Sequence, residues 1–223
     1  MKKEKDIEIL GFITSCYSYG NVALINRFIT EFTGKTGINL YEFTSNYSEH
    51  KDKKFLKGLN YRFNSADDLS ELINCTGKIL RKYGSLKNSF AEGYSIKNKN
   101  IIPALTEFVL KFRSGKKFSR GFNYLVPSPS DNSACKRLNL FLRWMVRKDE
   151  IDFGIWSDVI DKAGLLMPVD IHVYRISRKL ELVKRKSCDL KFAVELTDSL
   201  KKFDISDPVK YDFALCHFQM EKY

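Results

Sequence analysis

The sequence predicts an all-α fold. Apolar residues recur every three to four positions along most of the 223-residue chain, which is the period of an amphipathic helix. Strand signals are weak, because the stretch 37–48, rich in Thr, Tyr and Phe, lacks regular alternation and a hairpin turn. Apolar residues make up 43% of the chain, which is enough for a buried core and excludes a disordered basic tail.

Helical periodicity defines the expected elements in order. Three of them have a recognisable start: Ser65, Ser133, and Asp207 followed by a proline at the first helical position. We expect a long connection over 34–64 and a compact turn over 127–133. The predicted helices are 6–31, 66–83, 99–113, 134–148, 156–163, 170–181, 189–203 and 207–219.

The composition excludes several classes of protein. The longest apolar stretch, 101–112, is interrupted by Pro103, Glu107 and Lys111 and falls short of the ~20 residues that span a membrane. The charged N-terminus shows no signal peptide. The five cysteines are at least 28 residues apart and the three histidines are dispersed, so we expect no disulfide framework, no metal and no cofactor. A cytoplasmic location follows.

Positive charge is concentrated in one part of the chain. Residues 111–187 hold 17 Lys and Arg against 8 Asp and Glu, which is +9 of the formal net charge of +11. A basic region of this kind is typical of a surface that binds a polyanion such as DNA. The alternative is an ordinary solvated surface.

The predicted helix 134–148 places a lysine where helix stability does not favour one. Lys136 falls in the first turn, at the positive end of the helix dipole, which disfavours a cation and lowers the affinity of the amine for its proton. A nucleophilic lysine needs that property. The helix has one apolar face, and Lys136, Arg143 and Arg147 lie together on another face.

Asp170 follows Pro168 and Val169 at the start of the predicted helix 170–181. One interpretation is a helix cap that accepts backbone N–H groups. The other is a carboxylate, kept ionised by the helix N-terminus, that stabilises a developing cation or receives a proton.

The segment Pro168-Val-Asp-Ile-His-Val-Tyr-Arg175 resembles the (P/V)-VD-x-H-x-x-R segment of helix-hairpin-helix base-excision DNA glycosylases. The resemblance implies that Asp170 is the catalytic aspartate and Lys136 the nucleophile of a bifunctional enzyme. The residues 126–133 replace the glycine hairpin of endonuclease III, and 34 residues separate the two catalytic positions. Both departures are similar to the archaeal 8-oxoguanine glycosylase branch and a related bacterial family, whose recurring blocks resemble 6–12, 19–22, 83–86, 118–122, 133–147 and 207–215.

The resemblance also implies a pocket for the flipped base and a set of DNA contacts. Asp212 would accept a hydrogen bond from the purine, and Cys216, beside His217, stands where the archaeal branch has an aromatic residue. An iron–sulfur cluster, which needs four closely spaced cysteines, is excluded. Further pocket residues would be Tyr17, Tyr19 and Asn21. DNA contacts would come from Ser128, Ser130, Asn132, Ser133, Arg137, Arg143, Arg147, His172, Arg175 and Arg178.

The sequence therefore predicts a DNA repair glycosylase and AP lyase that flips and excises a damaged base, with 8-oxoguanine as the expected lesion. Alternatives are a monofunctional glycosylase for another lesion and a non-catalytic DNA-binding helical module. We expect a monomer that binds damaged double-stranded DNA, associates with the nucleoid and does not bind membranes. Its single glycosylase-like unit would have one helical subdomain at about 30–115, completed by the two chain ends, and a helix-hairpin-helix region at about 118–181, with a cleft between subdomains.

Overall fold

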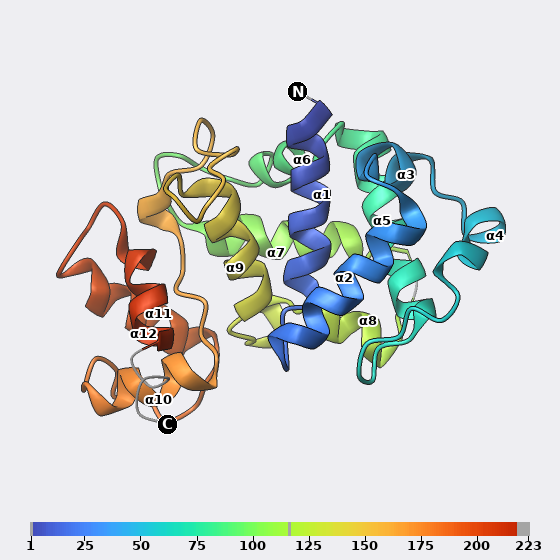
Figure 1. Ribbon diagram of the computed structural model, residues 1–223. Helices are drawn as coiled ribbons and strands as arrows, with labels where there is room; N and C mark the ends of the chain where they lie inside the picture. Colours follow the sequence, from blue (N-terminus) through green and yellow to red (C-terminus); the bar gives the residue numbers. More distant parts are fainter. Residues whose placement is uncertain (1, 116, 218–223) are drawn as a thin grey trace. The chain divides into compact units, whose positions relative to one another are not determined.

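The computed structural model describes residues 2–115 and 117–217, and within them the fold is all-α, as predicted (Figure 1). These residues form twelve α-helices and four short 3-10 helices, with two isolated β-bridges and no strand. The chain divides into two compact units. Unit 1 is Met1–Glu92 with Glu107–Pro127, and unit 2 is Gly93–Thr106 with Ser128–Tyr223. No helix of the described residues is long and apolar enough to cross a membrane.

Unit 1 is built around its longest helix, α5. The helix begins with a reciprocal capping box between Ser65 and Asp68 and ends at Gly84, whose φ of 77° suits glycine. The sequence-predicted bounds 66–83 are confirmed. The helices of this unit are α1 (Lys2–Cys16), α2 (Val22–Thr36), α3 (Leu40–Asn46), α4 (Glu49–Asp52), η1 (Lys53–Leu56), α5 (Ala66–Tyr83), α6 (Leu86–Ala91), the second half of α7 (Ile101–Phe112) and α8 (Arg120–Leu125).

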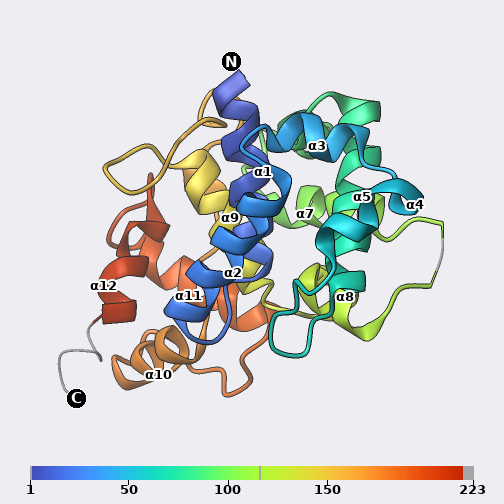
Figure 2. The ribbon, with the colours of Figure 1, turned by 45° about the vertical axis from the view of Figure 1, so that its right-hand side comes forward.

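Two close contacts between helices of unit 1 depend on Gly77 and on the buried side chain of Glu8. Helix α3 approaches α5 so closely that a Cβ at Gly77 would lie 2.4 Å from the carbonyl oxygen of Thr44, and the two helices lie side by side in Figure 2. The buried carboxylate of Glu8 accepts the backbone N–H groups of Leu86 (2.9 Å) and Lys87 (3.0 Å). Glu8 on α1 thereby satisfies the open N-terminal donors of α6.

Unit 2 packs its helices around a separate apolar cluster that includes Met167, Val173 and Phe192. The backbone N–H of Met167 donates to Thr197 Oγ1 (3.0 Å), which holds the extended segment before Asp170 against α11. This contact places Asp170 at the start of α10. The helices of this unit are the first half of α7, η2 (Pro129–Asp131), α9 (Lys136–Val146), η3 (Lys162–Gly164), α10 (Ile171–Lys179), α11 (Leu190–Lys201), η4 (Pro208–Tyr211) and α12 (Asp212–His217).

Three sequence predictions about the elements are wrong. The single helix 6–31 is two helices, because the chain turns between Cys16 and Val22 through Gly20, which has φ +88°. The connection 34–64 contains α3, α4 and η1. The helix 156–163 is a series of turns ending in η3, because Trp156 is a fully buried anchor and Asp161 caps η3 by accepting the N–H of Ala163 (2.9 Å).

Candidate active site

Lys136 is the first residue of α9, because the residue before it leaves the helical conformation. Cys135 has a left-handed backbone (φ 47°, ψ 38°) and a buried side chain. The first turn is closed by Asn139, whose backbone N–H donates to Cys135 O (2.9 Å) and whose Nδ2 donates to Ala134 O (2.9 Å). The half-buried Lys136 therefore lies at the positive end of an 11-residue helix, as the sequence predicts.

Asp170 is the N-cap of α10. Its Oδ1 accepts the backbone N–H groups of His172 and Val173, both at 2.9 Å. Both bonds end on the same oxygen, so Oδ2 is not used by the cap. The capping interpretation of Asp170 is confirmed, and it leaves one carboxylate oxygen for other chemistry.

Asp212, the first residue of α12, is buried and forms an ion pair with Arg143 of α9 through its Oδ2. The thiol of Cys216 lies 3.8 Å from Asp212 Oδ1. Burial raises the pKa of Asp212 above the usual range, and the positive charge of Arg143 opposes that increase. Arg143 therefore favours the ionised carboxylate in a place where water does not.

The charges of Lys136 and Asp170 both act on this buried carboxylate. After burial and Arg143, the negative charge of Asp170 raises the pKa of Asp212, and Lys136 lowers it. The same two residues act on Cys216, whose pKa rises to about 12, mainly through burial and the charge of Asp212. Lys136, Asp170, Asp212 and Cys216 are thus linked electrostatically, and all four belong to unit 2, where α10 packs against α12.

Comparison with known families gives one match. Residues 1–221 match the model of a family described as a protein of unknown function, DUF2400. The chain belongs to the DUF2400 family. No curated protein matches the chain, and no solved structure does. The family match assigns no activity to DUF2400, so the likeness to helix-hairpin-helix glycosylases rests on the motif residues alone.

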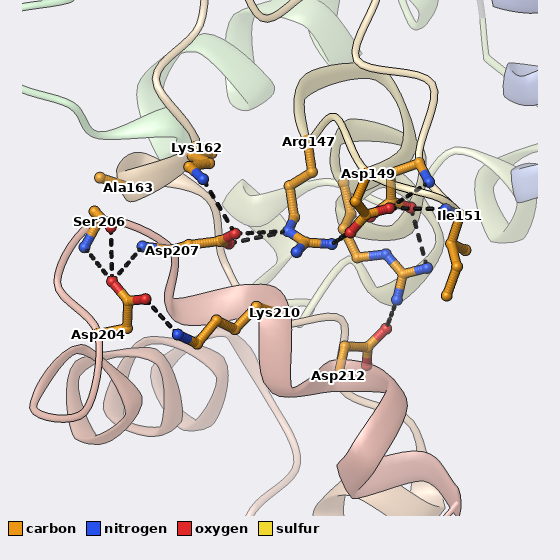
Figure 3. Close-up of polar contacts among 12 residues, drawn as sticks. Arg147, Asp149, Ile151, Lys162, Ala163, Asp204, Ser206, Asp207, Lys210 and Asp212 are labelled. Atoms are coloured by element: carbon orange, nitrogen blue, oxygen red, sulfur yellow. Dashed lines mark hydrogen bonds and ion pairs between the residues drawn. The ribbon is translucent and has the colours of Figure 1, made fainter.

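A network of ion pairs extends from the same helix of this DUF2400 chain (Figure 3). Arg147 contacts Asp152 (2.5 Å), Asp149 (2.8 Å) and Asp207 (2.9 Å). Arg143 reaches Asp152 at 3.3 Å in addition to its pair with Asp212. Burial would lower the pKa of Arg147, but its hydrogen bond to Asp207 and the nearby carboxylates raise it. The two guanidinium groups thus form ion pairs inside the protein, in place of the phosphate contacts expected from the sequence.

The other expected DNA contacts fall into two groups. Arg175 and Ser130 are exposed and remain available to a ligand. The rest of the group is buried or has a role in local structure. Arg137 is buried, Ser128 caps η2 by accepting the Ser130 N–H, Ser133 accepts the Cys135 N–H, Asn132 contacts Asp189, His172 is half-buried, and Arg178 donates to the carbonyls of Val183 and Lys184.

The pocket residues expected near the end of the first helix all lie in unit 1. Tyr17 is 1% exposed and packs on Phe28 (ring centroids 4.3 Å apart), so it is a core residue and not a pocket residue. Tyr19 is half-buried in an aromatic cluster. Asn21 caps α2, accepting the N–H of Ala23 (2.8 Å). The side chain of His217, expected beside the base, lies outside the described residues.

Two groups near the candidate site were not identified from the sequence. Asp152 is buried, and burial raises its pKa against the opposing charges of Arg143 and Arg147. Cys188 is exposed, and its thiol pKa is raised by desolvation, by Asp189 and by Asp170. The acidic run at 149–152, directly after two arginines spaced four residues apart, is a sequence signal for the ion pairs. Among the described residues, no group of three or more His, Cys, Asp and Glu side chains is arranged to hold a metal.

Proposed function

We propose that the protein is a DNA glycosylase and AP lyase that excises a damaged base, with 8-oxoguanine as the first lesion to test. The observation that carries the proposal is that Lys136 and Asp170 both interact electrostatically with Asp212. The two residues are 34 positions apart, yet each lies at a helix N-terminus and each acts on the pKa of the same buried carboxylate, Asp212. A lysine and an aspartate so placed can act as nucleophile and electrostatic partner.

The order of elements also supports a degenerate helix-hairpin-helix. Helix α8 ends at Leu125, the turn 126–133 follows, and α9 begins at Lys136. Asn132 has a left-handed backbone (φ 56°), a conformation that the usual hairpin supplies with glycine. We assign α8, this turn and α9 to the motif within the region 118–181.

In the proposed reaction, the target nucleotide is first flipped out of the duplex. The amine of Lys136 attacks C1′ as the bond to the base breaks. The departing base leaves with the electron pair and takes up a proton that the attacking amine releases. Asp170 Oδ2 stabilises the positive charge that develops on the sugar. The resulting amine adduct opens to an imine, whose C2′ proton is lost, and the 3′ phosphate leaves by β-elimination.

Asp212 and Cys216 supply the polar groups of a base site in this proposal. With Oδ2 of Asp212 bound to Arg143, Oδ1 is the oxygen that can accept an N–H of a purine. The Cys216 thiol, with a pKa of about 12, stays protonated at neutral pH. It donates to Asp212 Oδ1 and does not compete with Lys136 as nucleophile.

Borohydride trapping tests the nucleophile directly. The wild-type protein should form a reduced covalent adduct with a duplex that contains 8-oxoguanine. Lys136→Gln should form none while it still binds the duplex. The matched control is Lys191→Gln, because Lys191 is an exposed lysine in the first turn of another helix of the same unit. An adduct that persists in Lys136→Gln would overturn the nucleophile assignment.

A panel of duplexes with single lesions separates the alternatives. Strand cleavage without alkali supports the bifunctional enzyme. Cleavage only after alkali shows a monofunctional glycosylase and contradicts the lyase role. Binding without cleavage of any lesion shows a non-catalytic DNA-binding module.

A further inference from the structure

A tight turn in unit 1 presents an exposed aromatic side chain. Tyr61 and Asn64 exchange two backbone hydrogen bonds, each 2.9 Å long, so that Arg62 and Phe63 form the two-residue tip. Arg62 adopts φ 55°, which is uncommon for a residue with a side chain. Phe63 is 58% exposed. The turn thus combines an uncommon backbone conformation with an apolar ring that is exposed to solvent.

The turn is firmly anchored at its base. Tyr61 and Asn64 are 3% and 1% exposed. The hydroxyl of Tyr19 donates to Asn64 Oδ1 (2.5 Å), and the hydroxyl of Tyr61 donates to the carbonyl of Tyr19. Asn64 Nδ2 also donates to Asp68 Oδ2 (3.3 Å) at the start of α5. The exposed ring is therefore held by a well-anchored turn, which lowers the conformational entropy that is lost when the ring binds a ligand.

Phe63 belongs to a surface cluster of rings. Its centroid lies 4.8 Å from that of Tyr124, which is 40% exposed, and 5.6 Å from that of Tyr19. The guanidinium of Arg62 lies 5.9 Å from the Tyr19 ring centroid. Aromatic faces beside an arginine are the groups on which nucleobases stack.

The surrounding charge favours a polyanion. Residues 51–64 contain Lys51, Lys53, Lys54, Lys57 and Arg62 against one acid, Asp52, which is a net charge of +4. Lys53 is paired with Asp67 (3.1 Å) and Glu49 (3.6 Å), so the charge offered to a ligand comes from the other four. An apolar ring in a basic setting does not match a hydrophobic protein partner as well as it matches DNA, where lysines neutralise phosphates and a ring contacts bases.

We propose that Phe63 inserts into duplex DNA at an unpaired position and stacks on the neighbouring bases, while Arg62, Lys51, Lys54 and Lys57 contact the backbone. The inference takes its ligand from the proposed function, because a flipped nucleotide leaves such a vacancy. It does not depend on the chemistry at Lys136.

The test measures binding, not turnover. Fluorescence anisotropy gives the Kd for an intact labelled duplex and for the same duplex with one tetrahydrofuran abasic analogue, which has no C1′ leaving group. Wild type should prefer the second duplex. Phe63→Ala should lower that preference about tenfold, the loss expected for one stacking contact, and leave the Kd for the intact duplex within about twofold. Phe63→Trp should keep the preference and show quenched tryptophan emission on binding.

Ile38→Ala is the matched control, because Ile38 is an exposed apolar residue of the same unit, at 83% exposure. No preference in wild type, an unchanged preference in Phe63→Ala, or an equal loss in Ile38→Ala would overturn the inference. Self-association that disappears in Phe63→Ala, with DNA preference unchanged, would identify a second copy of the chain as the occupant instead. If borohydride trapping fails but the loss in Phe63→Ala is observed, the proposed chemistry fails and the stacking surface stands.

Discussion

At the residue scale, Asp170 uses one carboxylate oxygen for the cap of α10 and keeps the other outside it. Oδ1 accepts two backbone N–H groups of α10, and Oδ2 is outside the cap. The sequence suggested a cap or a catalytic carboxylate as alternatives, but the geometry allows both at once. A cap that fixes the side chain also fixes the direction in which the second oxygen points, which is the preorganisation that electrostatic catalysis needs.

Substitution separates these roles. Asp170→Asn should keep the cap, because asparagine caps helices about as well as aspartate, and its Tm should stay close to wild type. Removing the charge should lower single-turnover excision by roughly 10²- to 10³-fold. Asp170→Ala should lose activity and about 1 kcal/mol of stability as well. Full activity in a folded Asp170→Asn would exclude the electrostatic role.

At the element scale, an arginine within α9 and the residue that ends the helix form ion pairs in unit 2. Arg143 lies in α9 and Arg147 is its C-cap, and their carboxylate partners come from the acidic run at 149–152 and from Asp207 and Asp212 (Figure 3). These contacts tie α9 to the segment that leads into α12. The position of the candidate site thus depends on buried charges that must all be paired.

Arg143→Ala should therefore reduce the free energy of unfolding by about 3–5 kcal/mol, because it leaves Asp152 and Asp212 buried with one partner fewer. Urea unfolding followed by circular dichroism measures the change. Arg175→Ala, an exposed arginine of the same unit, should change stability by less than about 0.5 kcal/mol. Equal effects of the two substitutions would contradict the buried network.

The start of α11 gives a dependence of stability on pH. Asp189 caps the helix and pairs with Arg185, and this hydrogen bond lowers the pKa of Asp189. A depressed pKa stabilises the fold above the unfolded-state value of about 3.9, and the contribution is lost as pH falls below it. Asp189→Asn keeps a capping side chain without the charge. Thermal melts should show a lower Tm for this variant than for wild type. The difference should be largest near neutral pH and should shrink below about pH 4. A deficit that is constant with pH would refute this assignment.

At the scale of the whole molecule, less of the positive charge of residues 111–187 is available to a ligand than the sequence count suggests. Residues 111–187 contain +9 of the net charge of +11, but Arg143 and Arg147 within that region are paired with buried or half-buried carboxylates. In the proposed function, the charge that contacts DNA would come from exposed groups such as Arg175 and Lys179 on α10. Arg143 and Arg147, which were expected to contact phosphate, form internal ion pairs instead.

The salt dependence of binding tests which arginines contact phosphate. Arg175→Ala should reduce the slope of log K against log salt concentration by about one, as expected for one lost phosphate contact. Arg27→Ala should leave the slope unchanged, because Arg27 is an exposed arginine of unit 1 already paired with Glu31. A slope unchanged in Arg175→Ala would remove α10 from the DNA-binding surface.

The sequence predicts features with local causes and misses those with distant ones. The bounds of α5 follow from Ser65, Asp68 and Gly84, which are all adjacent to the helix. Lys136 and Asp170 are recognisable because each is at a helix start. The partners of Arg143 and Arg147 at 207 and 212 are 60 or more positions away, and no local pattern connects them. The burial of Tyr17 is likewise decided by Phe28 and Tyr61, not by its own spacing.

The distribution of the five cysteines has a practical consequence. Cys16, Cys75 and Cys135 are buried, and Cys216 is half-buried with a thiol that stays protonated at neutral pH. Cys188 is the exposed one of the five, and it is close enough to Asp170 for the charge of that carboxylate to raise its pKa. A maleimide dye should therefore attach at one native position beside the candidate site, and its emission would report ligand binding there without any engineered residue.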